Sequence, residues 1–246
     1  VLAWNAAHPQ TAGNRTSSVF GFVLPGGSER TALTVRIPHE VTGPAPPVTG
    51  SEPQVTGADA EVTWMLEPGM YFVAPGPVRV SGGQGVLVVA VGFEAMLSMG
   101  GPVEKEGRLP YIDGCSDTLL LPPPRYGDPC LNLLHFPSAI VQTRHTHPSG
   151  RAGVVARGRG TCIYVDPSGE EQRCALLPGV VFVIPTGLPH SFETAEGDEM
   201  EVIAFHPDSD FGPTAEAHPM INRTIVGGVS ASYLHDIRTS DAPRKQ

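Results

Sequence analysis

Charge and cysteine are both scarce in this sequence. Only 17% of its 246 residues are charged, and its 16 lysines and arginines are outnumbered by 25 acidic residues. Binding to nucleic-acid phosphates needs clustered basic side chains, so this composition argues against a nucleic-acid partner. The 4 cysteines are too few for a disulfide scaffold. We therefore expect a protein of the reducing cytoplasm.

Long apolar runs and sustained helical patterns are also missing. The longest apolar runs, such as residues 85–93, are about half as long as a membrane-spanning helix requires, so we expect no membrane association. No segment keeps an apolar period of 3.6 residues for more than about two turns. Glycine and proline are abundant instead, with 29 and 26 residues. Short β-branched or aromatic runs lie between these breakers, which predicts an all-β fold of short strands and tight turns.

A repeat divides the chain. Residues 68–75 (PGMYFVAP) align with residues 178–185 (PGVVFVIP), and proline, glycine, phenylalanine and valine recur at the same positions. A repeat of this period predicts two copies of one β domain, which we place at residues 1–100 and 111–246. The chain becomes polar and rich in turns from about residue 207, and we expect this C-terminal extension to wrap the surface.

Two histidines form a His-x-His pair directly after the apolar segment 139–143. In a β-strand, residues two apart point to the same face, so the side chains of His145 and His147 would lie on one side. The same alternation predicts that Thr143 faces the cavity of the domain with them. Two adjacent imidazoles are suited to binding one metal ion.

A third histidine follows the second copy of the repeat. The segment 179–190 contains a buried strand, a Pro185-Thr186-Gly187 turn and then His190. A strand that returns through this turn can bring His190 beside the His-x-His pair. We therefore predict that three imidazoles converge inside a β-barrel.

These residues resemble the two motifs of the cupin superfamily. The first motif is a glycine, five residues, His-x-His, three or four residues, a glutamate, six residues and a glycine. His145, His147 and Gly158 match it, whereas Ala139 stands at the leading glycine and Arg151 stands at the glutamate. The second motif is matched by Gly179, by the Pro-x-Gly turn and by His190, with a threonine in place of its final asparagine.

The repeat makes the chain resemble a bicupin whose N-terminal copy is degenerate. Gly69 and Pro75 match the second motif, but Pro77 replaces its second glycine and Val80 stands where His190 stands in the other copy. The resemblance implies two double-stranded β-helix, or jelly-roll, barrels, of which residues 1–100 form one without metal. The expected role of residues 1–100 is to bury an edge or a face of the second barrel.

The absence of the glutamate leaves a site of three histidines. Neutral ligands leave the full +2 charge of a divalent ion exposed, which favours an anionic ligand that binds through oxygen. Within cupins, such sites resemble those of thiol, β-diketone-cleaving and gentisate-type dioxygenases. The resemblance thus implies one divalent metal per chain, held by His145, His147 and His190. Fe(II) is favoured, and Zn, Ni, Mn and Cu remain possible because imidazole suits them all.

The function we favour is that of a mononuclear non-haem Fe(II) dioxygenase acting on a small organic acid or an enolic diketone. A Zn- or Ni-dependent isomerase, lyase or hydrolase remains an alternative, as does a non-catalytic cupin that binds a metal or ligand. We name Arg151 and Thr143 as candidate catalytic residues. Arg151 either extends into solvent or holds the anionic group of a small-molecule substrate. By resemblance to cupins we also expect a homodimer.

Overall fold

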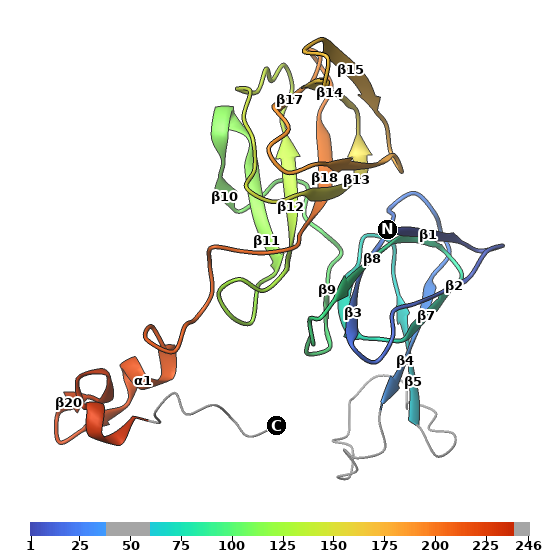
Figure 1. The fold of residues 1–246 in the computed structure, drawn as a ribbon. Coiled ribbons are helices and arrows are strands. Elements are labelled where there is room, and N and C mark those ends of the chain that lie inside the picture. The colour runs from blue at the N-terminus through green and yellow to red at the C-terminus, as the bar shows by residue number, and fades with distance from the viewer. Residues whose placement is uncertain (38–59, 239–246) are drawn as a thin grey trace.

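The computed structural model describes residues 1–37 and 60–238, and its strands form two units (Figure 1). The prediction of an all-β fold is confirmed, since the only α-helix among the described residues is α1 (Pro219–Arg223). None of the described helices is long and apolar enough to span a bilayer.

Nine strands make up the first unit. They are β1 (Leu2–Asn5), β2 (Gln10–Ala12), β3 (Ser17–Val23), β4 (Thr31–Ile37), β5 (Ala60–Leu66), β6 (Tyr71–Pro75), β7 (Val78–Ser81), β8 (Gln84–Val91) and β9 (Ser98–Gly100). They form two sheets, with strand orders β1-β8-β3-β6-β9 and β2-β7-β4-β5.

Nine further strands make up the second unit. They are β10 (Leu109–Pro110), β11 (Ser116–Leu121), β12 (Cys130–Phe136), β13 (Arg151–Gly158), β14 (Gly160–Val165), β15 (Glu171–Leu176), β16 (Val181–Ile184), β17 (His190–Glu193) and β18 (Met200–His206). A short 3₁₀ turn, η2 (Ile112–Gly114), precedes β11. The sheet orders are β10-β11-β12-β18-β13-β16 and β15-β14-β17.

The two units share one strand order. The run β1-β8-β3-β6 corresponds to β12-β18-β13-β16, and β7-β4-β5 corresponds to β17-β14-β15. The counterpart of β2 is the segment 139–147, which joins β17 through single bridges at Val141–Glu193 and His145–His190. This is a jelly-roll arrangement of two facing sheets, as predicted, and it explains the repeat at an interval of 110 residues.

The interior of the first unit is filled by apolar side chains. Val80 lies on β7 and pairs with Gln10 and Leu33, as His190 on β17 pairs with His145 and Tyr164. Val80 is fully buried in a cluster that also contains Leu33 and ten other apolar residues of this unit. The position equivalent to His190 is therefore part of a hydrophobic core.

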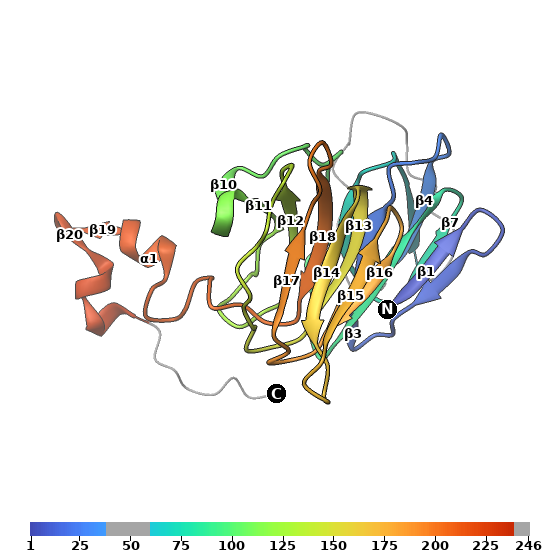
Figure 2. The same ribbon diagram turned by 90° about the horizontal axis from the view of Figure 1, so that it is seen from above.

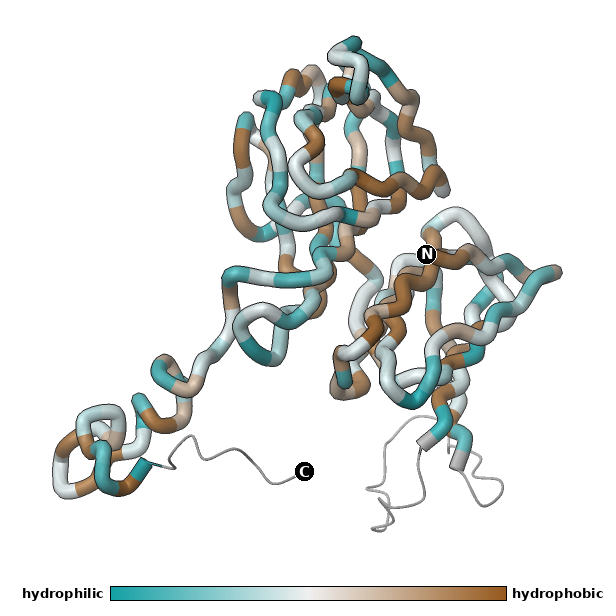
Figure 3. Tube along the Cα trace, viewed as in Figure 1, coloured by the Kyte–Doolittle hydropathy of each residue, from teal (hydrophilic) through white to brown (hydrophobic). Residues whose placement is uncertain are grey.

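A second hydrophobic cluster joins the units. Phe20 and Phe22 of β3 pack with Leu133 of β12 and with Ile203 and Phe205 of β18. The rings of Phe20 and Phe205 lie edge to face, with centroids 5.0 Å apart. The strands of the first unit that face the second are among the most apolar parts of the trace (Figure 3). The first unit thus covers one face of the second, and burying this surface favours their association.

The C-terminal extension departs from our prediction, because it projects away from both units instead of wrapping them (Figures 1 and 2). It contains α1, β19 (Ile225–Val226), β20 (Val229–Ser230), η3 (Ala231–Tyr233) and η4 (His235–Ile237). Hydrogen bonds form between residues of this segment, for example from the Ala231 amide to the Thr224 carbonyl at 2.7 Å. Backbone groups satisfied locally do not need the barrel surface. Residues 239–246 lie outside the described part.

Gly158, which closes the first motif, is required by the fold. It ends β13 with φ of +69°, and a Cβ atom there would lie 1.9 Å from the Glu199 carbonyl oxygen. We expect Gly158→Ala to lower the free energy of unfolding by about 2 kcal/mol or more, because left-handed strain and a backbone clash add. Urea denaturation measures this loss.

The matched control is Gly169→Ala in the β14–β15 hairpin. Gly169 also has a positive φ, +89°, but a Cβ atom at this position would have no neighbour within 4 Å. Its substitution should cost only the conformational strain, about 1–2 kcal/mol. Equal losses in the two variants would contradict the assignment of a clash at Gly158.

Candidate metal centre

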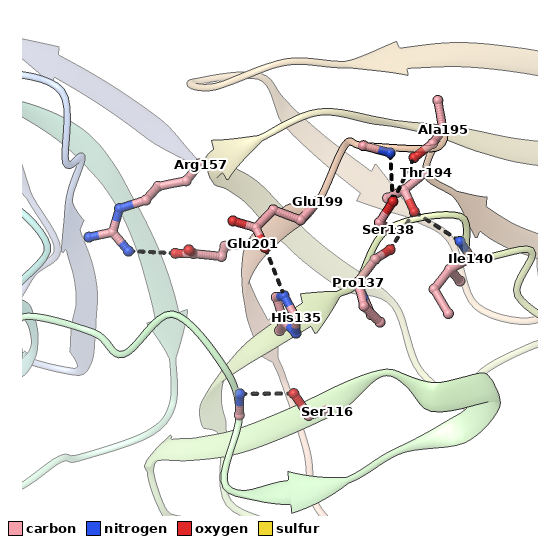
Figure 4. Close-up of polar contacts among 12 residues, drawn as sticks. Ser116, His135, Pro137, Ser138, Ile140, Arg157, Thr194, Ala195, Glu199 and Glu201 are labelled. Atoms are coloured by element: carbon pink, nitrogen blue, oxygen red, sulfur yellow. Dashed lines mark hydrogen bonds and ion pairs between the residues drawn. The ribbon is translucent and has the colours of Figure 1, made fainter.

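The segment that carries the His-x-His pair is held in place by Thr194, which directly follows β17. The Thr194 hydroxyl donates to the Pro137 carbonyl at 2.5 Å and accepts from the Ile140 amide at 3.1 Å (Figure 4). The Ser138 hydroxyl accepts from the Gly197 amide at 2.7 Å. Thr194, which stands where the second motif has asparagine, therefore fixes the turn that precedes the histidines.

Regular strand alternation does not hold in this segment, which contradicts our placement of Thr143. Ala139 has φ of +60°, and the segment makes only single bridges with β17. Thr143 is exposed, and its amide and hydroxyl both donate to the Asp113 carboxylate, at 2.7 and 3.1 Å. Gln142 points into the cavity instead and is 4% exposed. The structure thus gives Thr143 no place in the cavity.

The three predicted histidines do converge. Ligand atoms of His145, His147 and His190 all lie within 4.8 Å of one another. Reciprocal backbone hydrogen bonds of 2.9 and 3.0 Å between His145 and His190 fix these two residues side by side. The His147 carbonyl accepts from the Gly187 amide at 3.0 Å, which ties the pair to the Pro-x-Gly turn.

Hydrogen bonds orient two of the imidazoles. Nδ1 of His145 lies 2.8 Å from the Thr143 carbonyl, and Nδ1 of His190 lies 2.8 Å from the Leu188 carbonyl. A carbonyl only accepts, so both Nδ1 atoms carry a proton, and in the neutral imidazole Nε2 is then the nitrogen that can bind a metal. Nε2 of His190 is buried without a hydrogen-bond partner. This donor set fits a divalent metal ion, because backbone carbonyls commonly orient metal-bound histidines in this way.

The three histidines line a cavity of about 290 Å³ inside the second unit. One part of its wall is apolar and includes Phe136, Phe182 and Phe192. The polar residues on its wall, apart from the three histidines, come from several elements. They are Tyr111, Asp117, Asn132, Gln142, Arg151 and His206.

Comparison with known proteins agrees with this geometry. Residues 133–206 match a family model described as a cupin domain, and this range includes all three histidines. The chain contains a cupin domain. The match covers less than half of the chain, and the first unit lies outside it. No curated protein matches the chain in sequence.

Several solved structures are distantly similar to the chain. Oxalate oxidase in complex with glycolate is 18% identical, with 42% of this chain and 56% of that chain covered and a TM-score of 0.35. The 7S globulin of Momordica charantia is 13% identical, over 80% and 68%, with a TM-score of 0.47. A cupin 2 conserved barrel domain protein from Leptotrichia buccalis is 12% identical, over 82% and 79%, with a TM-score of 0.48. The chain therefore spans little more than half of the oxalate oxidase chain.

Arg151, at the glutamate position of the first motif, lies in the wall of the cupin cavity. Its side chain is only 13% exposed, so it does not extend into solvent. Nη1 donates to the carbonyls of Ser149 and Gly150, both at 3.1 Å, and to the Ser149 hydroxyl. The Asp208 carboxylate lies 3.9 Å away, and Nε is buried without a partner. One edge of the guanidinium is thus anchored to the backbone.

His206 is a cavity residue of the cupin domain that the sequence did not indicate. It ends β18 and shares the inward face with Val202 and Ala204. Burial, assisted by the charge of Arg151, lowers the pKa of His206 to about 3. Burial likewise lowers the pKa of His147 to about 4, with Arg151 again contributing. Both imidazoles are neutral at pH 7, the form in which histidine binds metals.

These low pKa values predict that the metal-free cupin domain loses stability in mild acid. An unfolded histidine titrates near pH 6.5, whereas His206 stays neutral in the fold down to about pH 3. Between these values the unfolded state binds more protons, so stability falls as pH drops, by up to about 1.4 kcal/mol per pH unit for one group. Urea denaturation from pH 7.5 to 4.5 should show this slope.

The variant His206→Leu should show a shallower slope than the native protein. Its control is His8→Gln, because His8 lies at the surface and has no place in the cavity. A slope that is unchanged in His206→Leu would show that other groups cause the loss of stability in acid.

Proposed function

We propose that this protein is a metal-dependent enzyme, a mononuclear non-haem Fe(II) dioxygenase that acts on a small organic acid or an enolic diketone. One ion per chain would be held by His145, His147 and His190. The observation that carries the proposal is the convergence of three imidazoles at a cavity of about 290 Å³, with two Nδ1 protons bound by carbonyls. When bound, Fe(II) supplies the redox chemistry for O2 and a position for an oxygen ligand.

The residues of the chain would bind the substrate and keep water away from it. The phenylalanines of the wall enclose its apolar part. Arg151 is a positively charged group of the wall, so it is suited to hold a carboxylate or enolate. A neutral His206 leaves the positive charge of Arg151 available to that anion. We propose that Arg151 acts in this way, and we propose no role for Thr143.

The experiment is elemental analysis followed by measurement of O2 uptake. The purified protein is analysed for Fe, Zn, Ni, Mn and Cu, then loaded anaerobically with Fe(II) and offered a panel of small organic acids and β-diketones. Iron with substrate-dependent O2 uptake supports the proposal. Tightly held zinc or nickel without uptake would replace it with a Lewis-acid isomerase, lyase or hydrolase, or with a non-catalytic cupin.

We also propose that residues 1–100 and 111–246 are two domains of one cooperative body that forms a homodimer. The apolar cluster between the units supports the first part, because neither unit would bury these residues alone. Light scattering measures the molecular mass in solution, and a monomeric mass at micromolar concentration would contradict the proposed homodimer. Urea unfolding in two separate transitions would argue against a single cooperative body.

A further inference from the structure

Two cysteines of the second unit stand opposite each other across the β14–β15 hairpin. Cys162 of β14 and Cys174 of β15 are directly paired in the antiparallel register, and both thiols are free. Directly opposed residues of antiparallel strands have Cα atoms about 4.5 or 5.5 Å apart. A disulfide bond spans about 4.4–6.8 Å between its Cα atoms, so the backbone already has the separation that a bridge requires.

The side chains of the two cysteines also influence each other. Opposed residues of a sheet point to the same face, and by strand alternation this face of the hairpin also carries Tyr164. Burial raises the pKa of Cys162 to about 11, and the nearby Cys174 contributes to this shift. The charge of a Cys174 thiolate is the largest cause of the raised pKa of Tyr164. The register and these interactions agree that the two sulfur atoms are neighbours.

The two thiols differ in exposure and in protonation. Cys174 is exposed, whereas Cys162 is 8% exposed and belongs to a hydrophobic cluster of the second unit. An oxidant from solvent therefore reaches Cys174 first, and Cys162 with its high pKa stays a protonated thiol at pH 7. A hydrogen bond between the Tyr164 hydroxyl and Cys174 favours the Cys174 thiolate, which is the form that attacks a peroxide.

The strand β15 can approach β14 because it lies at an edge. It ends the sheet order β15-β14-β17, and Arg173, Cys174 and Ala175 on it are exposed. Opposed Cβ atoms lie about 4.5–5.5 Å apart, whereas a disulfide needs about 3.5–4.5 Å, so a bridge requires a small movement of the edge strand. An exposed bridge that needs such a movement is readily reduced by thiols. The geometry therefore fits a reversible bond.

The other two cysteines have no cysteine opposite them. Cys130 pairs with His206 across β12 and β18, and Cys115 lies beside the amide of Gln142. Both are buried. The register therefore singles out one pair among the 4 cysteines of the chain.

We propose that Cys162 and Cys174 form a redox-sensitive modification site, at which a hydroperoxide converts the two thiols into a reversible disulfide. The Cys174 thiolate attacks one oxygen of hydrogen peroxide, and the O–O bond breaks to leave a sulfenic acid and hydroxide. Sγ of Cys162 then bonds to Sγ of Cys174 and displaces the hydroxyl, which leaves as water with the Cys162 proton. The hydroxide takes up the proton that Cys174 had lost.

The two thiols thus lose two electrons, and one peroxide becomes two waters. The inference does not depend on the metal centre or on the proposed function, because no cavity residue takes part in the reaction.

The test treats zinc-loaded protein with hydrogen peroxide and counts thiols after denaturation. Zinc is used because it is not redox-active. We expect 4 thiols before treatment and two fewer after it, and dithiothreitol should restore all 4 under native conditions. Trypsin cleaves after Arg159, Arg173 and Arg223, so the peptides 160–173 and 174–223 should be joined in the oxidised sample and separate after reduction.

Three variants test the roles of the two thiols. In Cys162→Ser, oxidation should stop at a sulfenic acid on Cys174, which dimedone traps. Cys174→Ser should keep all its remaining thiols. Cys130→Ser is the matched control, because it removes a strand cysteine that faces His206, and it should still form the bridge.

The thiol count and the peptide map of the native protein decide the proposal even if a variant does not fold. Retention of all 4 thiols after treatment overturns it. A disulfide that joins two chains, or that joins any other pair of cysteines, overturns it equally.

Discussion

Replacing His190 with alanine is expected to abolish metal retention. His190 is fully buried, and its unpartnered Nε2 belongs to the cluster formed with the other two imidazoles. Loss of a residue that only orients a metal ligand costs about 10–100-fold in affinity, so loss of one of three ligands should cost more than about 100-fold. Elemental analysis after dialysis should find about one metal per native chain and almost none in His190→Ala.

The effect should also be visible in thermal stability. A ligand that binds only the folded state raises its stability, so adding the metal should raise the Tm of the native protein and leave that of His190→Ala unchanged. His147→Ala should behave in the same way. His206→Leu is the matched control, because His206 lies in the same cavity but outside the three-histidine cluster. A metal content near two per chain, or full retention in His147→Ala, would rule out the three-histidine site.

The second large effect is expected for Arg151→Leu. Removing a charged hydrogen-bond partner of a bound carboxylate should cost roughly 1.5–3 kcal/mol, which raises KM for an acidic substrate by about tenfold or more. Metal content should not change, because Arg151 is not among the clustered ligands. Steady-state kinetics with the acid found in the O2-uptake screen, and with its methyl ester, measures the effect.

The control is Arg144→Leu, which removes an equal charge close to the site in sequence. Arg144 forms an ion pair with Glu171 at the surface and does not line the cavity. It should leave KM unchanged. If Arg151→Leu also leaves KM unchanged, or raises it equally for the acid and its ester, then Arg151 supports the loop 149–150 and does not bind the substrate.

The contrast between Thr143 and Gln142 shows why the sequence pattern could not predict which of these two residues lines the cavity. Alternation in a regular strand placed Thr143 in the cavity, but positive φ at Ala139 and single bridges to β17 interrupt that alternation. Instead, the carboxylate of Asp113, which lies 30 residues earlier in the chain, accepts two hydrogen bonds from Thr143. No local pattern contains an interaction between residues so far apart. Gln142 therefore could be found only from coordinates.

The sequence by itself determined the all-β class, the repeated unit and the three histidines. These features depend on local chemistry: breakers between short apolar runs, a Pro-x-Gly turn, and His-x-His spacing. It also indicated that the first unit lacks the histidine, since Val80 stands in its place. Only the tertiary structure decided which polar groups share the cavity with these histidines. Arg151, Gln142 and His206 come from different elements, and burial, pairing and orientation depend on how those elements pack.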